Sequence, residues 1–444
     1  MKMKRQFPSL LSLPLALILV LNLTGCFQKT VSTGKPEDDS SISSTADSSV
    51  SPLPQTAQTV NLMENIQKNT VTGKTADDTF TASTADFAVS LFQKTVTENE
   101  NSLISPLSVM IALSMTANGA DTQTKSEMET LLGGAIPLEE LNEYLYSYVQ
   151  SLPSDDTSKL HLANSIWFRD DENRLTVEPD FLQKNADYYG AAAYKSPFDQ
   201  QTLQDINNWV KENTNGMIDQ MIDQIDLFDV MYLINAIAFD AEWENTYTKD
   251  AVREGVFTAI DGSKHTVQMM SSTEHLYLDD GKASGFMKDY KGGKYSFVAL
   301  LPKEGVNIND YVSSLTGENL IHVIQDAQNA SVSAQLPKFS YDYFVKMKEA
   351  LITLGMPTAF DGTQADFSKL GKSTYGNIFI GDVLHKTFIS VDELGTKAGA
   401  ATAVITKDNA VLPEYSVVLD RPFVYFIIDR ETSLPLFMGT VMNF

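Results

Sequence analysis

The sequence of 444 residues is poor in cysteine, histidine and positive charge. Its single cysteine, Cys26, cannot form an internal disulfide and leaves a cysteine-based zinc site without ligands. The five histidines are scattered and form no HExxH or other close pair, so we expect no metal centre. Lys and Arg number 33 against 57 Asp and Glu, and the net charge of −24 argues against nucleic-acid binding through counterion release.

Motifs typical of enzymes are also missing. GxSxG does not occur, and the Gly371-Lys372-Ser373 string lacks the upstream glycine and the apolar strand of a phosphate-binding loop. Pairs of acidic residues lie in polar surroundings and do not have the spacing of a calcium loop. We therefore expect that the protein is not an enzyme.

The N-terminus has the features of an export signal. Lys2, Lys4 and Arg5 precede an apolar run at 10–23, which is shorter than the roughly 20 residues that a membrane span needs. The following Leu-Thr-Gly-Cys resembles the bacterial lipobox, in which Cys26 would become the lipidated first residue; the alternative is a buried thiol within a hydrophobic segment. The resemblance implies a signal peptide at 1–25 and a protein anchored to the outer face of a bacterial membrane, with release to the extracellular space left open.

A polar segment separates this signal from the rest of the chain. Residues 28–59 are rich in Ser, Thr, Pro and Asp and bury too little apolar surface to order themselves. We assign 26–78 to the lipidated cysteine and a linker, although Leu62, Met63 and Ile66 form one short amphipathic stretch. Residues 79–444 are then one large folded domain.

Within this domain, helical and strand patterns are mixed without regular alternation. A helix is expected from a cap at Thr79 or Thr84, and another from Pro106 to the Asn118-Gly119 stop. Further helical patterns occupy 201–214, 309–327 and 341–354. Apolar strand-like runs occupy 160–168, 230–239, 295–302, 331–339, 388–391, 415–420, 423–429 and 435–441. Strands that are dense toward the C-terminus predict an α+β fold rather than a doubly wound α/β fold.

The segment 384–412 has the most unusual composition. An apolar strand leads to Asp392 and Glu393, then to Gly395-Thr396 and a run of small residues at 398–403. As a strand, this segment would place only small side chains on one face, namely Thr396, Ala398, Ala400, Thr402 and Val404. Such a face could enter a sheet without clashes, whereas the alternative is a closely packed small-residue helix.

At this point the chain resembles the serpin family of serine protease inhibitors over nearly the whole folded part. The matching segments, in order, are NSLISPLSVMIALSMTANGADTQTKSEM, LANSIWF, INNWVKENTNGMI, LINAIAFDAEW, LPKF, LGMPTAF, ADFS, HKTFISVDELGTKAGAATAV and DRPFVYFIIDRETSLPLFMGTV. The resemblance implies a large, mostly antiparallel central sheet, further sheets, about eight or nine helices and an exposed reactive-centre loop.

The resemblance also implies a mechanism. A serpin offers its loop to a protease, and the cleaved loop inserts into the central sheet while the protease stays attached as an acyl-enzyme. Inhibitory members have a hinge of small residues, and the matching positions here are Glu393, Gly395, Thr396, Ala398, Gly399, Ala400, Ala401 and Thr402. Lys397 and Gly399 depart from the usual acidic residue and alanine, but both belong to the outward face. The hinge therefore predicts an inhibitory protein.

The scissile bond is predicted from the family's usual distance beyond the hinge. Counting from Gly395 gives Asn409-Ala410, and bonds within one or two residues of it are alternatives because the distance to Pro422 is slightly long. Lys407-Asp408 would suit a trypsin-like protease, and Ala410-Val411 an elastase-like or subtilisin-like protease. The target therefore stays open.

Further residues match structural positions of the family. Ser105, Ser108, Asn235 and His385 match a polar cluster beneath the sheet that holds its strands closed. Trp243, Lys338 and Glu393 match the point where the loop inserts, and we expect Lys338 and Glu393 to pair. Asp240-Ala241 stands where the family usually has Lys-Gly before the tryptophan.

The leading hypothesis is thus an anchored, monomeric inhibitor that forms a covalent 1:1 complex with an extracellular serine protease, and cysteine proteases are a further target class. A non-inhibitory serpin that acts as a binding module is the alternative. No cofactor is implied, and we expect no nucleic-acid partner.

Overall fold

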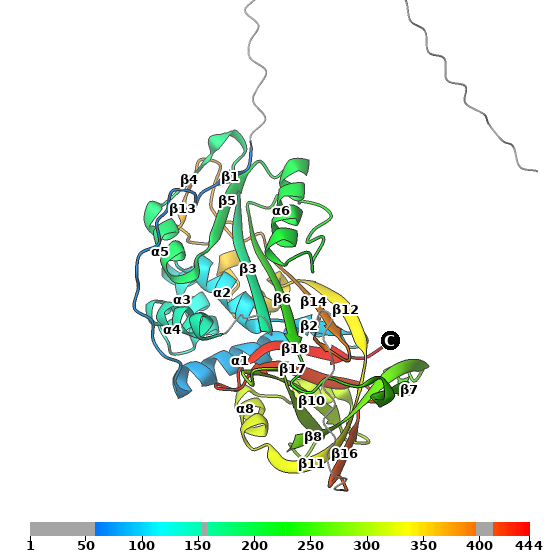
Figure 1. Ribbon diagram of the computed structural model, residues 1–444. Helices are drawn as coiled ribbons and strands as arrows, with labels where there is room; N and C mark the ends of the chain where they lie inside the picture. Colours follow the sequence, from blue (N-terminus) through cyan, green and yellow to red (C-terminus); the bar gives the residue numbers. More distant parts are fainter. Residues whose placement is uncertain (1–57, 153–157, 227, 397–411) are drawn as a thin grey trace, which may run out of the picture. The chain divides into compact units, whose positions relative to one another are not determined.

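Two large β-sheets and one small sheet, with helices packed on them, form the part of the chain described by the computed structural model (Figure 1). The structure describes residues 58–152, 158–226, 228–396 and 412–444. Helices and strands alternate irregularly along the sequence, and the predicted α+β class is confirmed.

The first sheet contains the strand that leads into the 384–412 segment. Its strands, in spatial order, are β1 (Val60–Asn61), β5 (Ala192–Ser196), β3 (Ser158–Arg169), β6 (Met231–Glu242), β15 (Gly395–Thr396), β14 (Asp382–Val391) and β12 (Phe339–Lys346). β3 is parallel to β5 and β6 is parallel to β14, whereas the other neighbours are antiparallel.

The second sheet contains the strands that follow this segment. Its strands, in spatial order, are β16 (Tyr415–Val418), β11 (Gln328–Pro337), β8 (Lys264–Asp279), β9 (Ala283–Asp289), β10 (Tyr295–Pro302), β17 (Phe423–Asp429), β18 (Pro435–Val441) and β2 (Ser102–Ile104), with β7 (Val252–Thr258) paired to β8. A small third sheet pairs β4 (Leu175–Val177) with β13 (Gly371–Ser373).

The helices cover both sheets. They are α1 (Asp78–Thr95), α2 (Pro106–Ala117), α3 (Thr122–Gly133), α4 (Leu138–Ser151), α5 (Pro179–Tyr189), α6 (Gln200–Asn213), α7 (Ile308–Ser313), α8 (Gly317–Gln325) and α9 (Lys348–Thr353), with short 3-10 turns at Asp171–Asn173, Lys249–Ala251 and Thr358–Phe360. Among the described residues, none of these helices is long and apolar enough to cross a membrane.

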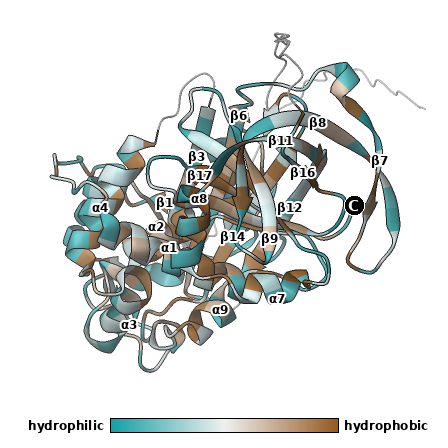
Figure 2. Cartoon of the chain, turned by 90° about the horizontal axis from the view of Figure 1, so that it is seen from below, coloured by the Kyte–Doolittle hydropathy of each residue, from teal (hydrophilic) through white to brown (hydrophobic). Residues whose placement is uncertain are grey.

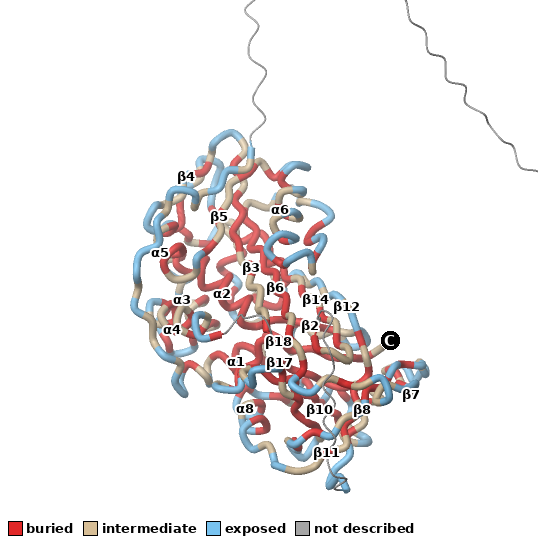
Figure 3. Tube along the Cα trace, viewed as in Figure 1, coloured by how far each residue is buried: buried red, intermediate tan, exposed pale blue. Residues whose placement is uncertain are grey.

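Helix α2 lies deep within the folded unit. Pro106 opens the helix, Ser105 caps it, and every residue of α2 is buried against β3, β6 and β18 (Figure 3). A second apolar cluster, which includes Ile206 and Val210 of α6, covers the opposite face of the first sheet. Hydrophobic residues gather in the interior of the folded unit, whereas outer helices such as α4 carry hydrophilic residues (Figure 2). The part of the first sheet that lies beneath α6 is therefore covered on both faces, whereas the outer face of β12 is exposed.

The main error of the sequence patterns concerns residues 341–354. The first half of the predicted helix belongs to strand β12, which ends at Lys346, and only Lys348–Thr353 is helical. Tyr341, Tyr343 and Val345 pack toward the core while the residues between them are exposed, which is the two-residue period of a strand. The predicted helix at 309–327 is likewise divided into α7 and α8.

The folded unit also begins earlier than residue 79. Helix α1 starts at Asp78 with Asp77 as its cap, and residues 58–77, which the sequence analysis places in the linker, lie against the domain. Val60–Asn61 pairs with β5, Leu62, Met63 and Ile66 pack on the core, and Asn69 donates two hydrogen bonds to the Asp187 carboxylate. The short amphipathic stretch is thus part of the domain, because the edge of β5 and the neighbouring core give it partners.

The first sheet has two ends, which lie at the first and the last residue of strand β14. Asn61, Tyr194, Trp167, Tyr232 and Asp382 pair in one row across the sheet, at the start of β14. The strand β15 lies beside Val391, at the other end of β14. At about 3.3 Å per residue, these two ends are about 30 Å apart. We call them the distal end and the hinge end.

Candidate functional site at the hinge end of the first sheet

The hinge residues Gly395 and Thr396 form a short strand between β6 and β14. Gly395 pairs with Glu242, and Thr396 pairs with Ala241 on one side and with Val391 on the other. A Cβ atom on Gly395 would lie 2.0 Å from the carbonyl oxygen of Ala241, so only glycine fits this position. Thr396 is 1% exposed. The first two residues of the small-residue segment are therefore already seated in the sheet.

Toward the distal end, β6 and β14 pair directly with each other. This parallel pairing runs from Tyr232–Asp382 to Ile237–Thr387 and ends there. At the hinge end, β15 occupies the space between the same two strands. Any strand that continued from Thr396 toward the distal end would have to separate β6 from β14.

A turn at Asp392–Leu394, here called the hinge turn, precedes β15 and is held by the segment 243–247. The Trp243 amide donates to the Leu394 carbonyl at 2.8 Å, and its indole Nε1 donates to the Asp392 carbonyl at 2.8 Å. The Tyr247 amide donates to the Glu393 carbonyl at 2.9 Å. All three carbonyls of the hinge turn are thus satisfied by one short segment.

The structure also brings Lys338 and Glu393 together in an ion pair across the hinge turn. The hydrogen bond from Lys338 lowers the pKa of the Glu393 carboxyl, with burial acting in the opposite direction. The Glu393 side chain is 39% exposed, so the pair contributes only modestly to stability.

A buried polar cluster crosses the sheet where the direct pairing of β6 and β14 lies. Asn235 on β6 pairs in register with His385 on β14, and Nδ1 of His385 is hydrogen-bonded to the Asn235 side-chain oxygen. The other ring nitrogen, Nε2, accepts from the Ser105 amide at 3.0 Å. Asn235 in turn donates to the Ser108 hydroxyl at 2.5 Å. The four predicted residues therefore connect α2 to both strands.

The histidine in this cluster is neutral. Complete burial lowers the pKa of His385 to about 3, although its hydrogen bond to Asn235 acts in the opposite direction. A charged imidazolium would also have no acceptor for its second N–H, because Nε2 already accepts from the Ser105 amide.

Most of the predicted reactive segment lies outside the described residues. This holds for the hinge positions Ala398, Gly399, Ala400, Ala401 and Thr402 and for the candidate bond residues Lys407, Asp408, Asn409, Ala410 and Val411. The described chain resumes at Leu412, which is 88% exposed, and enters the second sheet at β16, which is parallel to β11. The segment 397–411 thus connects one sheet to the other.

Three residues of the site are not singled out by the sequence analysis. Asn164 on β3 extends the polar cluster to a third strand, because Asn235 also donates to its side-chain oxygen. Tyr290 contacts Thr396, and Lys288 lies buried behind the 243–247 segment. The sequence does contain one signal that could have pointed to Asn164 and Lys288. Each is a polar residue within an otherwise apolar strand, in LANSIWF and SGFMKDY respectively.

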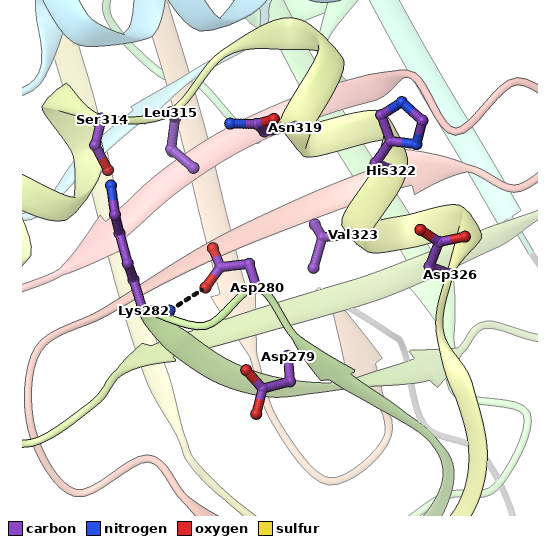
Figure 4. A pocket seen from close by; sticks show the side chains of 9 residues that line it. All are labelled: Asp279, Asp280, Lys282, Ser314, Leu315, Asn319, His322, Val323 and Asp326. Carbon is purple, nitrogen blue, oxygen red and sulfur yellow. Dashed lines mark hydrogen bonds between the residues drawn. The ribbon is translucent and has the colours of Figure 1, made fainter.

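A polar pocket between α8 and the turn after β8 was a second candidate (Figure 4). Two of its three carboxylates already have partners, because Asp280 accepts from the Tyr311 hydroxyl at 2.7 Å and Asp279 pairs with Lys303 at 2.8 Å. Within the described ranges, no group of three or more His, Cys, Asp or Glu residues could hold a metal ion. The hinge end therefore remains the candidate site.

Comparison with known proteins gives one family. The family model described as "Serpin (serine protease inhibitor)" matches residues 82–444. A serpin-like protein of Thermococcus kodakarensis is 30% identical over 80% of this chain and 83% of its own length. Leukocyte elastase inhibitor A of Mus musculus is also 30% identical, over 80% of this chain and 96% of its own length.

Solved structures share the fold of this chain. The crystal structure of the thermophilic serpin tengpin in its native state is 52% identical and has a TM-score of 0.84, covering 87% of this chain and all of tengpin. The latent state of tengpin, at 49% identity, has a TM-score of 0.74 and covers 84% of this chain and 99% of tengpin. The present structure is thus more similar to the native state than to the latent state.

Proposed function

Since this chain belongs to the serpin family, whose members are mostly protease inhibitors rather than enzymes, we propose that it traps extracellular serine proteases through its 397–411 segment. The protease serine would attack the carbonyl of Asn409 and release the new amino terminus at Ala410. The cleaved segment would then insert between β6 and β14 before the ester is hydrolysed. The product would be a covalent 1:1 complex of a monomeric inhibitor.

The observation that carries this proposal is the position of β15. Gly395–Thr396 already pairs with both β6 and β14, and the direct pairing of these strands begins only at Ile237 and Thr387. Insertion would extend β15 toward the distal end, with Thr396 and every second residue after it facing inward. No inward position of the hinge carries a bulky or charged residue in the sequence.

The energetics fit a native state that is kinetically trapped. Each new ladder hydrogen bond contributes a net of about 0.5–1.5 kcal/mol, so an inserted strand is strongly favoured once it forms. The hydrogen bond between Asn235 and His385 opposes the separation of β6 from β14, and the bond from Asn235 to Asn164 ties β6 to β3. These contacts resist a change in the sheet. They would delay insertion until cleavage frees the segment.

We also propose that the protein is held at the outer face of a bacterial membrane by lipid on Cys26. The sequence motif is the basis of this proposal, and the direction of the described chain is compatible with it. Val60–Asn61 lies at the distal end of the first sheet, opposite to the hinge end. A tether that arrives at the distal end would leave the reactive segment facing away from the membrane.

The test mixes purified residues 27–444 with subtilisin-like, elastase-like and trypsin-like proteases at near-equal ratios. We expect a complex that survives denaturing electrophoresis, and a released peptide whose mass places its first residue at Ala410 or within two residues of it. Cleavage within 397–411 without any such complex would contradict trapping and favour a non-inhibitory binding module. A complex formed with a cysteine protease of the papain type would extend the target class.

A further inference from the structure

Lys288 is a buried cation whose surroundings connect it to the hinge turn. Its side chain is 2% exposed, and its ammonium donates to the Glu274 carboxylate at 2.9 Å. Lys288 lies on β9 and Glu274 on the neighbouring strand β8 of the second sheet, so this charge pair is not part of the first sheet. An ammonium with so little access to water needs strong partners on every side.

The remaining partners of Lys288 all belong to the segment 243–247. Its ammonium donates to the carbonyl of Asn245 at 3.1 Å. It also lies 4.4 Å from the ring centre of Tyr247 and 5.5 Å from that of Trp243, which are distances of favourable cation–π contacts. The cation therefore touches both residues that hold the hinge turn, and the carbonyl between them.

The same segment also binds the hinge turn. As described above, the Trp243 and Tyr247 amides and the Trp243 indole donate to the carbonyls of Leu394, Glu393 and Asp392. Bending the chain at 243–247 so that three donors converge on one turn requires a fixed backbone. The Asn245 carbonyl accepts a hydrogen bond from Lys288, and this bond fixes the middle of the bend.

We propose that Lys288 is a positioning residue that holds the segment 243–247 in the shape that retains the hinge turn, so that the Lys288–Glu274 pair controls how easily the hinge is released. Only the link to loop insertion rests on the proposed function. Retention of the hinge turn can be measured without any protease. The pair thus regulates loop insertion from the second sheet, outside the strands that separate.

The test compares Lys288→Met with the double variant Lys288→Met/Glu274→Gln. The single variant leaves a buried, unpaired carboxylate, so we expect a lower denaturant midpoint as well as a loosened hinge. The double variant removes both charges, and we expect its midpoint to return toward that of the wild type. The contacts to Asn245, Tyr247 and Trp243 stay lost, and the hinge should stay loose.

Hydrogen exchange measured by mass spectrometry reports on the hinge directly. In both variants we expect exchange in peptides covering 242–248 and 390–396 to rise roughly tenfold or more, the factor that corresponds to loss of one charge-assisted hydrogen bond. Exchange in α2 of the double variant should stay as in the wild type. The matched control is Lys211→Met, which removes the exposed ion pair between Lys211 of α6 and Asp219. This variant should leave exchange unchanged in the peptides covering 242–248 and 390–396.

A double variant with wild-type exchange at 242–248 and 390–396 would overturn the proposal and reduce the pair to a contribution to general stability. If the double variant does not fold, Tyr247→Leu tests the same link without changing a charge, and unchanged exchange at 390–396 would again overturn it. A wild type that traps no protease, together with faster exchange in these variants, would reject the proposed function and leave the positioning role standing.

Discussion

The hydroxyl of Tyr290 lies 2.5 Å from the hydroxyl of Thr396, beneath the hinge end of the first sheet. Tyr290 is fully buried, stacks on Trp243 at 4.5 Å between ring centres, and belongs to a backbone segment that forms a bridge with Trp243. Burial raises the pKa of the Tyr290 hydroxyl, although its hydrogen bond with Thr396 acts in the opposite direction. The first inward side chain of the reactive segment is therefore already in a polar contact below the sheet.

This contact makes Thr396 sensitive to charge. We expect Thr396→Glu to lower the free energy of unfolding by at least about 3 kcal/mol, because Thr396 is already buried between β6 and β14 and an unpaired carboxylate at this position is costly. The measurement is the denaturant midpoint. Thr396→Ser keeps a small hydroxyl and serves as the control; an unchanged midpoint for the glutamate variant would contradict the burial of this position.

The ion pair between Lys338 and Glu393 should have a smaller effect. We expect Glu393→Gln to hasten spontaneous loss of inhibitory capacity on incubation by less than about fivefold, because a half-exposed pair contributes at most about 1 kcal/mol. The residual trapping of a protease after timed incubation measures this rate. Asp219→Asn, which removes an exposed pair on the α6 side, is the comparison; an acceleration of about a hundredfold would mean that this pair controls hinge release.

The neutral His385 predicts a specific pH dependence. Its pKa is about 3 in the folded state and about 6.5 in an unfolded chain, so between these values the unfolded state binds the additional proton. Stability from this group is present above about pH 6.5 and is lost as the pH falls toward 3, by up to about 1.4 kcal/mol per pH unit. Denaturant unfolding from pH 7 to pH 4 measures this slope.

The control for this slope is a variant that lacks the histidine. His385→Gln should be less stable at pH 7, because the contacts to Asn235 and Ser105 are weakened, but its stability should fall less steeply with acid than that of the wild type. His322→Gln removes a histidine that is exposed on α8 and should keep the wild-type slope. Equal slopes for the wild type and His385→Gln would contradict a neutral, buried His385.

The proposed anchor predicts that the length of chain before residue 58 matters only on a membrane. Insertion would carry the protease toward the distal end, where Val60–Asn61 lies. Residues 27–57 can reach at most roughly 100 Å, and deleting 36–55 would leave about 40 Å, which is no more than the width of a protease domain. We therefore expect the deletion to lower the yield of complex on vesicles that carry the lipidated protein.

The matched control is the same deletion with Cys26→Ser, assayed in solution, where the yield should be unchanged. Equal yields on vesicles for the full-length and shortened linkers would contradict this arrangement of the distal end and the membrane. Failure of Cys26→Ser to release the protein from membranes would reject the anchor itself.

Several local features of the structure could be predicted from the sequence. The glycine at 395, the small side chains after it and the strand patterns at 160–168, 230–239 and 423–429 follow from the rules for close backbone approach and for buried strands. Residues 341–354 were misread because Tyr341, Tyr343 and Val345 form a strand face that a short apolar pattern does not distinguish from a helix. The polar cluster residues were found only through the family's motifs.

The sequence by itself determined which residue types stand at the hinge. These are a glycine, a threonine and a run of small side chains that follow an acidic pair. Only the tertiary structure decided that Asn164, Asn235 and His385 meet in one row, that Lys288 lies behind the segment 243–247, and that residues 58–77 belong to the domain. The reason is that these contacts join residues far apart in the chain. Strand register and burial bring them together, and both are set by the packing of the whole domain.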